Sequence, residues 1–228
     1  MTDGTGVTGG IGGTGERPRL RRDAERNRQR IIAAAREVFQ ERGTAATLND
    51  VAHHAGVGVG TVYRRFPNKE VLVDALFEDM VNAMERYVVE ALAVPDAWTG
   101  LLEALERMCE LQAFDRGLRE VLLGMGRGPE RQIQVEARIG RDFDRLLDRA
   151  REQGALRADA VGADMPVIQL MLGAVSEYTA TPGLWRRYLY VLMDGMRAHP
   201  ENSALPAVRT DQPIFTGRPV RTSQPPGP

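Results

Sequence analysis

The chain has 228 residues, of which 43% are hydrophobic and 27% are charged, and these proportions are ordinary for a globular protein. Its single cysteine, Cys109, excludes an internal disulfide and any zinc site built from several cysteines. No stretch approaches the roughly 18 apolar residues of a membrane span, and residues 1–16 lack the apolar run of a signal peptide. We therefore expect a cytoplasmic protein with no membrane partner.

The net charge of −1 conceals an uneven distribution of charged residues. Residues 17–72 hold twelve basic and six acidic residues, whereas the remainder of the chain is acidic overall. Lys69, the only lysine among the 30 basic residues, lies in this basic block. A basic block at one end of an acidic body indicates a polyanionic partner at that end. From charge alone, a solvated charged face is the alternative.

The residue pattern in the N-terminal third of the chain predicts three helices. Residues 1–20 are low in complexity and predict a disordered tail. A first helix should end near Gly43, because apolar residues recur before it at spacings of three and four: Ile31, Ile32, Ala35, Val38 and Phe39. Thr47 can cap a second helix, and Gly56 ends it where we expect a positive φ. A third short helix precedes Pro67.

The rest of the chain predicts longer helices. Asn68 can cap a helix that runs from Lys69 to about Ala93. Further helices are expected at about 97–114, 116–125, 129–153, 159–180 and 183–198. The fold class is therefore all-α, with about nine helices. We expect a disordered tail at 1–20, a three-helix helix-turn-helix domain at 21–68, a helical bundle at 69–198 and a second tail at 199–228.

The segment from Thr47 to Phe66 has the pattern of a helix-turn-helix. Its apolar residues lie where two crossed helices would meet, so the opposite face of the second helix should be free. Small, hydroxyl and basic side chains on that face suit a DNA major groove: Val59, Gly60, Thr61, Tyr63 and Arg64. An ordinary helical hairpin in a bundle is the alternative that spacing alone leaves open.

The residues from about 28 to 77 resemble the DNA-binding domain of TetR-family transcriptional regulators. The resemblance is carried by the run T47-x3-V51-A52-x2-A55-G56-V57-x2-G60-T61-V62-Y63-x2-F66-x2-K69-E70-x-L72, which follows the helix ending AREVFQERG. It implies that Val59, Gly60 and Thr61 lie at the groove, and that Asn49 can reach a base. It also implies phosphate contacts from Thr47, Tyr63, Arg65 and Lys69.

Two features of this region depart from the family pattern, and three arginines before it could extend the DNA contact. Gly58 replaces the serine that many relatives carry after the turn, and glycine is a weaker cap. The recognition helix also lacks long polar side chains before Tyr63, so direct base readout should be sparse, with DNA shape supplying part of the specificity. Arg22, Arg26 and Arg28 could add electrostatic contacts or enter the minor groove.

No residue pattern predicts a metal or cofactor site. His53 and His54 are adjacent on a helix, so their side chains point about 100° apart and cannot chelate one ion. Cys109 lies on a largely apolar helix, which favours core packing over redox sensing. No catalytic cluster stands out, so an enzyme or cofactor carrier is disfavoured.

The C-terminal body is rich in methionine and aromatic residues, most of which must form its core. Such side chains can also open a cavity, and the family resemblance implies one for a small-molecule ligand. The candidates for its lining are Trp98, Met108, Met125, Phe143 and Met165. In the family the last two helices form a dimer interface, for which the candidates are Leu172, Val175, Trp185, Leu189, Leu192 and Met196.

The sequence thus predicts a ligand-responsive repressor. It should bind a palindromic double-stranded operator as a homodimer and be released by a small, mostly apolar molecule. The alternative is a constitutive architectural DNA-binding protein without a ligand.

Overall fold

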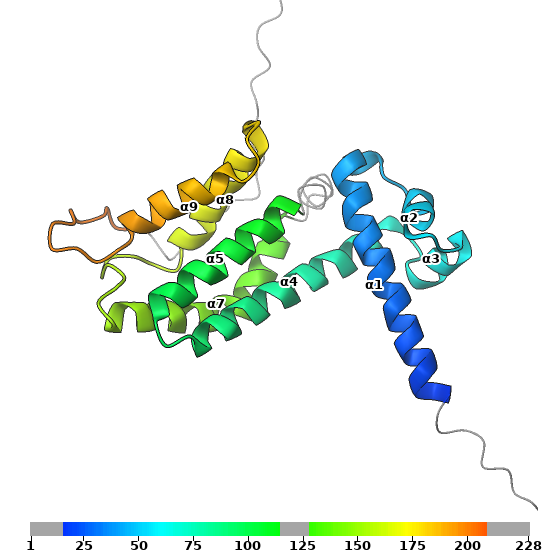
Figure 1. The fold of residues 1–228 in the computed structure, drawn as a ribbon, viewed down its shortest axis with the longest axis horizontal. Coiled ribbons are helices and arrows are strands. Elements are labelled where there is room, and N and C mark those ends of the chain that lie inside the picture. Colours follow the sequence, from blue (N-terminus) through cyan, green and yellow to red (C-terminus); the bar gives the residue numbers. More distant parts are fainter. Residues whose placement is uncertain (1–15, 115–127, 209–228) are drawn as a thin grey trace, which may run out of the picture.

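The computed structural model describes residues 16–114 and 128–208. Over these residues the chain forms eight α-helices and one short 3-10 helix, which confirms the all-α prediction (Figure 1). The elements are α1 (Glu16–Arg42), η1 (Gly43–Ala45), α2 (Leu48–Ala55), α3 (Val59–Arg65), α4 (Lys69–Ala93), α5 (Ala97–Phe114), α7 (Gly128–Glu152), α8 (Asp164–Tyr178) and α9 (Leu184–Gly195). The helix expected at 116–125 and the candidate Met125 lie outside the described residues.

The first core lies between α1, α2, α3 and the beginning of α4. It contains the apolar residues whose spacing predicted the first helix, and all of them are buried: Ile31, Ile32, Ala35, Val38 and Phe39. Val51 and Ala52 of α2 are fully buried where α2 crosses its neighbours. These contacts hold α3, which has only seven residues and includes Gly60, in a helical conformation that its own propensity would not sustain.

Helix α4 belongs to both halves of the molecule. Its first turns, including Leu72 and Phe77, pack into the first core, and its later turns, including Val88, pack into the core of the body. Figure 1 shows α4 running from the α2–α3 region into the bundle of α5 and α7. The helix starts at Lys69 and ends at Ala93, as predicted, with the Asn68 side chain accepting a hydrogen bond from the Val71 N–H at 2.9 Å.

The body is built on close contact between α4, α5 and α7. A Cβ added to Gly100 of α5 would lie 2.6 Å from the Ala91 carbonyl oxygen, so only glycine permits this approach of α5 to α4. Arg149 of α7 donates hydrogen bonds to the carbonyl oxygens of Leu92 (2.6 Å) and Val94 (2.9 Å). These carbonyls have no partner within α4, so α7 supplies the cap that the helix end requires.

The two ends of the described chain differ from the predicted tails. Helix α1 begins at Glu16, so part of the tail expected at 1–20 is helical. At the other end, the buried Arg157 guanidinium pairs with Asp159 and donates to the Ser203 carbonyl oxygen. Asp159 in turn accepts a hydrogen bond from the Leu205 N–H at 2.8 Å. The chain after α9 is therefore fastened to the body as far as Leu205 instead of beginning a tail at 199. None of the helices in the described ranges is long and apolar enough to cross a membrane.

Candidate nucleic-acid interface

The entry into α2 is organised by a capping box. The Thr47 side chain accepts a hydrogen bond from the Asp50 N–H at 3.2 Å, and Asp50 accepts from the Thr47 N–H at 2.9 Å. The Thr47 hydroxyl also donates to the Asp50 carboxylate at 2.7 Å. These bonds, with the charge of nearby Arg42, hold the pKa of Asp50 below its ordinary value.

Thr47 therefore has a structural role as the N-cap of α2. Its hydroxyl proton is directed to Asp50, so the phosphate contact expected of Thr47 would compete with the cap. Arg42 completes the cluster, since its guanidinium donates to Asp50 at 2.6 Å. Thr47 was predicted as the cap but Asp50 was not, although a Thr-x-x-Asp pattern before an apolar run is a recognisable capping signal.

The turn between α2 and α3 has the positive φ that was expected at Gly56. Gly56 has φ +62°, which an L side chain rarely adopts, and it closes α2 in a left-handed conformation. Arg30 of α1 donates a hydrogen bond to the Ala55 carbonyl oxygen at 2.9 Å, which fastens α1 to this turn. Gly58 then begins α3 without a side-chain cap, as expected from the missing serine.

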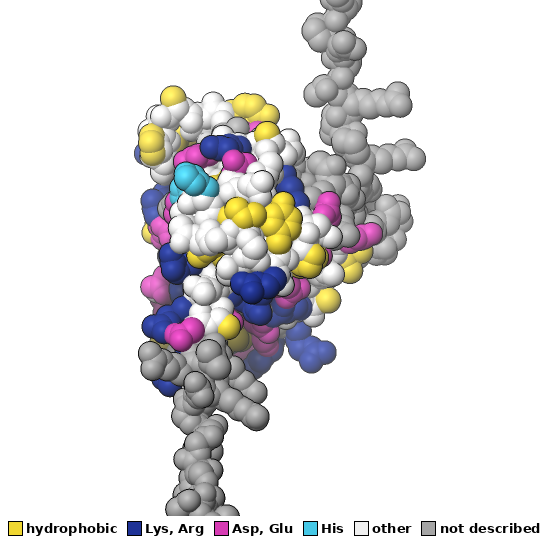
Figure 2. Space-filling view, turned by 90° about the vertical axis from the view of Figure 1, so that its right-hand side faces the viewer, with side chains coloured by type: hydrophobic (Ala, Val, Ile, Leu, Met, Phe, Trp, Pro, Cys, Tyr) yellow, Lys and Arg dark blue, Asp and Glu magenta, His cyan; other side chains and the backbone are white. Residues whose placement is uncertain are grey.

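The outward face of α3 is the most distinctive surface of this domain. Val59 is 45% exposed and Tyr63 is 44% exposed, although Val62 between them is fully buried. A Cβ added to Gly60 would meet no atom within 4 Å, so this position lies on open surface. Figure 2 looks onto this side of the molecule and shows hydrophobic side chains near its centre with Lys and Arg around them.

The remaining candidates surround this face. Arg64 and Arg65 end α3 and are exposed, and Thr61 is half-buried beside them. Asn49 is exposed on the first turn of α2. A short apolar strip with open backbone and flanking cations can enter a major groove, because phosphate contacts position the helix and methyl or ring contacts read thymine edges.

Lys69 lies at the edge of the same surface but has a partner within the chain. Its ammonium donates a hydrogen bond to the Thr44 carbonyl oxygen at 2.7 Å and lies 5.3 Å from the centre of the Phe39 ring. Burial lowers the pKa of Lys69, and the charge of Glu70 partly opposes that shift. The lone lysine therefore connects the first turn of α4 to the α1–α2 connection.

The histidines and the cysteine carry no site in the described part of the chain. His54 pairs with Glu37 of α1 at 2.6 Å, and His53 is exposed. No group of three or more potential metal ligands occurs within 16–114 and 128–208. Cys109 is buried, as predicted, and burial raises the pKa of its thiol to about 12, which leaves it unreactive near neutral pH.

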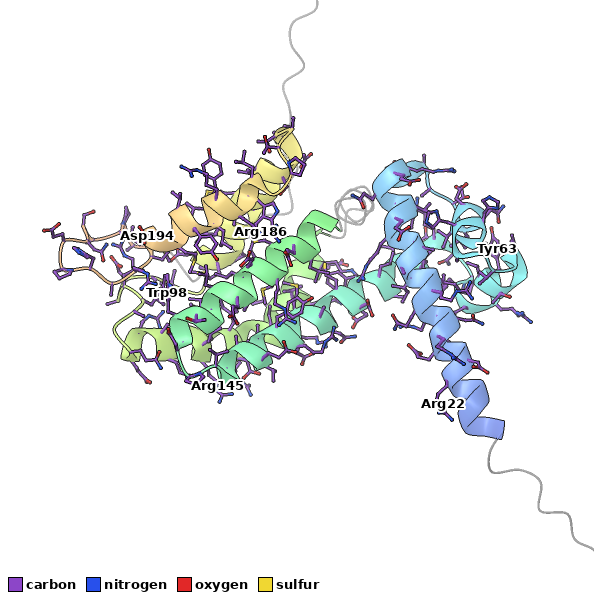
Figure 3. The ribbon with its side chains drawn as sticks, viewed as in Figure 1. Arg22, Tyr63, Trp98, Arg145, Arg186 and Asp194 are labelled. Carbon is purple, nitrogen blue, oxygen red and sulfur yellow. The ribbon has the colours of Figure 1, made fainter. Side chains whose placement is uncertain are left out.

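The candidate ligand-lining residues that the structure describes all lie in the body core. Trp98, which is labelled in Figure 3, belongs with Met108, Phe143 and Met165 to one buried cluster, in which each of the four is at least 92% buried. A polar side chain enters this cluster, because the Gln169 amide lies 3.3 Å from the Met108 sulfur. Gln169 was not predicted as a site residue, because no spacing signal distinguishes it from a surface glutamine.

The candidate interface residues on α8 and α9 also point into the chain's own core. Leu172, Trp185, Leu189 and Met196 are buried, and Val175 and Leu192 pack against the same cluster. The residues that these helices leave on the surface are different ones: Leu170, Met171, Tyr178, Tyr188, Tyr190 and Val191. The four buried candidates hold the two helices on the body, whereas the partly buried Val175 and Leu192 and the exposed set remain accessible to a partner.

Comparison with known proteins agrees with this geometry. Residues 31–76 match the model described as bacterial regulatory proteins, tetR family, and residues 96–198 match the C-terminal domain of SbtR-like transcriptional regulators. The solved TetR transcription regulatory protein from Mycobacterium vanbaalenii is 34% identical with a TM-score of 0.62, over 78% of this chain and 99% of that one. The TetR regulator SCO0520 from Streptomyces coelicolor is 28% identical with a TM-score of 0.63, over 75% of this chain and 98% of that one.

A curated relative shows a more partial match. The HTH-type transcriptional regulator SrpR from Pseudomonas putida is 30% identical over 139 residues, which are 59% of this chain. The chain spans 65% of that relative's length, slightly less than two thirds.

Proposed function

Because the chain belongs to the TetR family of bacterial transcriptional regulators and carries an SbtR-like C-terminal domain, we propose that it represses transcription by binding a palindromic operator as a homodimer. A small, mostly apolar molecule releases the operator. The family is one of regulators and not of enzymes. The exposed face of α3 is the observation that carries the proposal, since Val59 and Tyr63 are exposed apolar residues on either side of an open Gly60 backbone.

In this proposal α3 enters the major groove. Val59 contacts a thymine methyl group, and Gly60 allows the backbone to approach the base edges. Tyr63 and Arg65 bind phosphates on either side, and Asn49 reaches the groove from the beginning of α2. Lys69 contributes to the phosphate contacts with the two N–H groups that its bond to Thr44 leaves available.

The same geometry supports a dimer. One half-site offers a seven-residue recognition helix, which is a small contact, and a twofold pair presents two such helices to grooves about 34–36 Å apart. The apolar residues on the outer side of α8 and α9 would be covered by a second copy: Leu170, Met171, Tyr178, Tyr188 and Val191. Tyrosine and methionine are enriched at protein interfaces, and this set includes two tyrosines and Met171.

Helix α4 and helix α7 supply a route from ligand to operator. Met80 of α4 and Val135 of α7 pack against both cores, and the Arg131 guanidinium of α7 lies 4.4 Å from the Phe77 ring of the first core. Arg131 also pairs with Asp74. A ligand that shifts α7 would therefore move the beginning of α4 and with it the spacing of the two recognition helices.

The ligand itself would occupy the methionine- and tryptophan-rich interior of the body. Methionine side chains can rearrange around an apolar guest, and Gln169 offers one polar contact inside an apolar lining. The ligand must bind the released conformation more tightly. A coupling of about 1–3 kcal/mol would lower operator affinity about 5–150-fold.

The test begins with duplexes that the wild-type protein enriches from a random-sequence pool. Enrichment of an inverted repeat, with a preference that changes for Val59→Ala and not for Val89→Ala, would support the proposal. Val89 is a suitable control because it is 53% exposed on α4, outside the helix-turn-helix. Binding without sequence preference, together with no thermal shift by any member of an apolar ligand library, would instead favour a constitutive architectural protein.

A further inference from the structure

Helix α1 extends well past the domain to which it belongs. Ile31 is the first of its described side chains to join the core, and fifteen residues of this 27-residue helix, 16 to 30, precede it. Figure 1 shows this portion of α1 projecting beyond α3. The described side chains of this portion, from Arg22 to Arg30, add no residue to the core, so the stability of the fold does not explain them.

The composition of the extension is strongly basic. Residues 16–30 contain seven arginines and three acidic residues, and no lysine. The arginines thus supply most of the positive charge of the basic block outside the helix-turn-helix. Arginine remains charged at any physiological pH and presents a planar fork of donors that matches phosphate oxygens.

The structure connects this charge to the recognition helix. Arg30 is bonded to the Ala55 carbonyl oxygen, in the turn that leads directly into α3. Arg26 and Arg22 lie four and eight residues before Arg30, so they continue along the same side of the helix by about one turn each. On the part of α1 that precedes Arg30, both of these side chains are exposed. Arg26 is 76% exposed, and it forms an ion pair with Asp23, which also belongs to α1.

We propose that the extension of α1 is a second DNA-binding element, whose Arg22 and Arg26 contact backbone phosphates flanking the half-site that α3 reads. The inference rests on the proposed operator binding and extends its footprint along the duplex. The contacts are made by a preformed helix against the phosphate backbone, in place of an arm inserted into the minor groove. They carry no sequence information, so they add affinity and salt dependence without changing operator preference.

The experiment compares Arg22→Gln/Arg26→Gln with the wild type on an enriched operator, in a version with long flanks and a version trimmed to the two half-sites. A dimer of the glutamine variant lacks four arginines. On the long duplex, the slope of log affinity against log salt concentration should therefore become less steep by up to about 3.6, and the affinity should fall tenfold or more. Trimming the flanks should cost the wild type affinity and should remove the difference between the two proteins.

Two further variants make the result specific. Arg145→Gln is the matched control, because Arg145 is also highly exposed and paired with an aspartate three residues away, but it lies on α7 in the body (Figure 3). Arg22→Lys/Arg26→Lys retains both positive charges, so it should retain most of the salt dependence. This variant therefore separates the loss of charge from any effect of substitution on the helix.

The outcomes separate this inference from the proposed function. A wild type that enriches no duplex at all would contradict operator binding itself. A wild type that binds, with the glutamine double variant indistinguishable from Arg145→Gln, would overturn only the role of the extension. A loss that is equally large on the trimmed duplex would place the arginines inside the half-site and would likewise overturn the proposed flanking contact.

Discussion

The Lys69 ammonium and the Thr44 carbonyl oxygen are joined by a hydrogen bond of 2.7 Å across 25 residues of sequence. The bond links the beginning of α4 to η1, and so it helps set the angle at which α4 leaves the helix-turn-helix. Because an ammonium has three N–H groups, this bond leaves two for a phosphate. A structural and a DNA-binding role can therefore coexist in one side chain.

We expect Lys69→Ala to affect both roles. Loss of the bond to Thr44 should lower the melting temperature by a few degrees at most, because one hydrogen bond is worth about 0.5–1.5 kcal/mol and this one is exposed. Binding to every duplex should weaken, and the salt slope should decrease by about one phosphate contact per protomer. A variant with lowered stability and an unchanged salt slope would restrict Lys69 to its structural role. Fluorescence anisotropy across a salt series, read beside thermal unfolding, makes the distinction.

Gly60→Ala should separate stability from DNA binding. The added methyl group would meet no atom of the chain, and alanine is favoured over glycine within a helix by about 0.5–1 kcal/mol. The free energy of unfolding should therefore rise, while operator affinity should fall because the methyl group occupies the space between backbone and base edges. An affinity equal to that of the wild type would show that α3 does not approach the bases at this residue.

Val191→Glu should yield monomers with weak operator binding. Val191 is 56% exposed on α9, so a carboxylate there is solvated in a monomer and desolvated in the proposed dimer. Charges at Leu189 would be uninformative, because Leu189 is fully buried and its substitution would unfold the body. Val89→Glu on α4 is the matched control, with Val89 at 53% exposure. Sedimentation at micromolar concentration gives the answer, and a dimeric Val191→Glu protein would exclude this face.

Arg131→Gln should uncouple the body from the DNA-binding domain. In the wild type, operator binding should slow amide hydrogen exchange in the first turns of α7, since Arg131 joins them to Asp74 and Phe77. The variant should bind operator but lose that protection. Arg107→Gln is the control: Arg107 makes an equivalent pair with Glu90 and lies 3.9 Å from the Tyr87 ring, entirely within the body. Protection that persists in Arg131→Gln would contradict this route.

Asp50 should make the DNA-binding domain sensitive to acid. The pKa of Asp50 is lowered from its ordinary value of 3.8 in the folded protein, so the unfolded chain takes up the proton first. The stability contributed by the capping box is therefore present above about pH 4 and is lost as the pH falls through that value toward the folded pKa. Asp50→Asn should be less stable near neutral pH and should lose less stability on acidification. Parallel acid-unfolding curves for the two proteins would contradict this assignment.

Much of the helix-turn-helix could be predicted from local chemistry. Thr47, Gly56 and Asn68 have the predicted capping or left-handed roles, and α4 has the predicted ends. Caps and turns are decided by side chains within a few residues of the backbone groups that they satisfy, so their signals are present in a short stretch of sequence. The apolar spacing of α1 likewise predicted which of its residues are buried.

Long-range contacts could not be predicted in this way. The bond from Lys69 to Thr44, the fastening of α1 to the turn by Arg30, and the connection of Arg131 to Phe77 each join residues at least 25 positions apart. For α8 and α9 the apolar residues were evident in the sequence, but which of them face the body and which face outward was not. Both sides of α8 carry apolar residues, so its periodicity alone gives no preferred side. On α9 the buried Trp185, Leu189 and Met193 recur every four residues, but exposed tyrosines and Val191 lie beside the arginines of its outer side and add to the apolar residues from which the core had to be chosen.

The sequence by itself determined most of the helices, the N-caps Thr47 and Asn68 and the exposed face of α3, because these depend on local hydrogen bonds and on the 3.6-residue period of one helix. Only the tertiary structure decided which apolar side chains are core and which are surface on α8 and α9, and which partner each long arginine or lysine takes. Those choices depend on the relative positions of helices that are distant in the chain, where many flexible side chains could reach several partners and packing selects one.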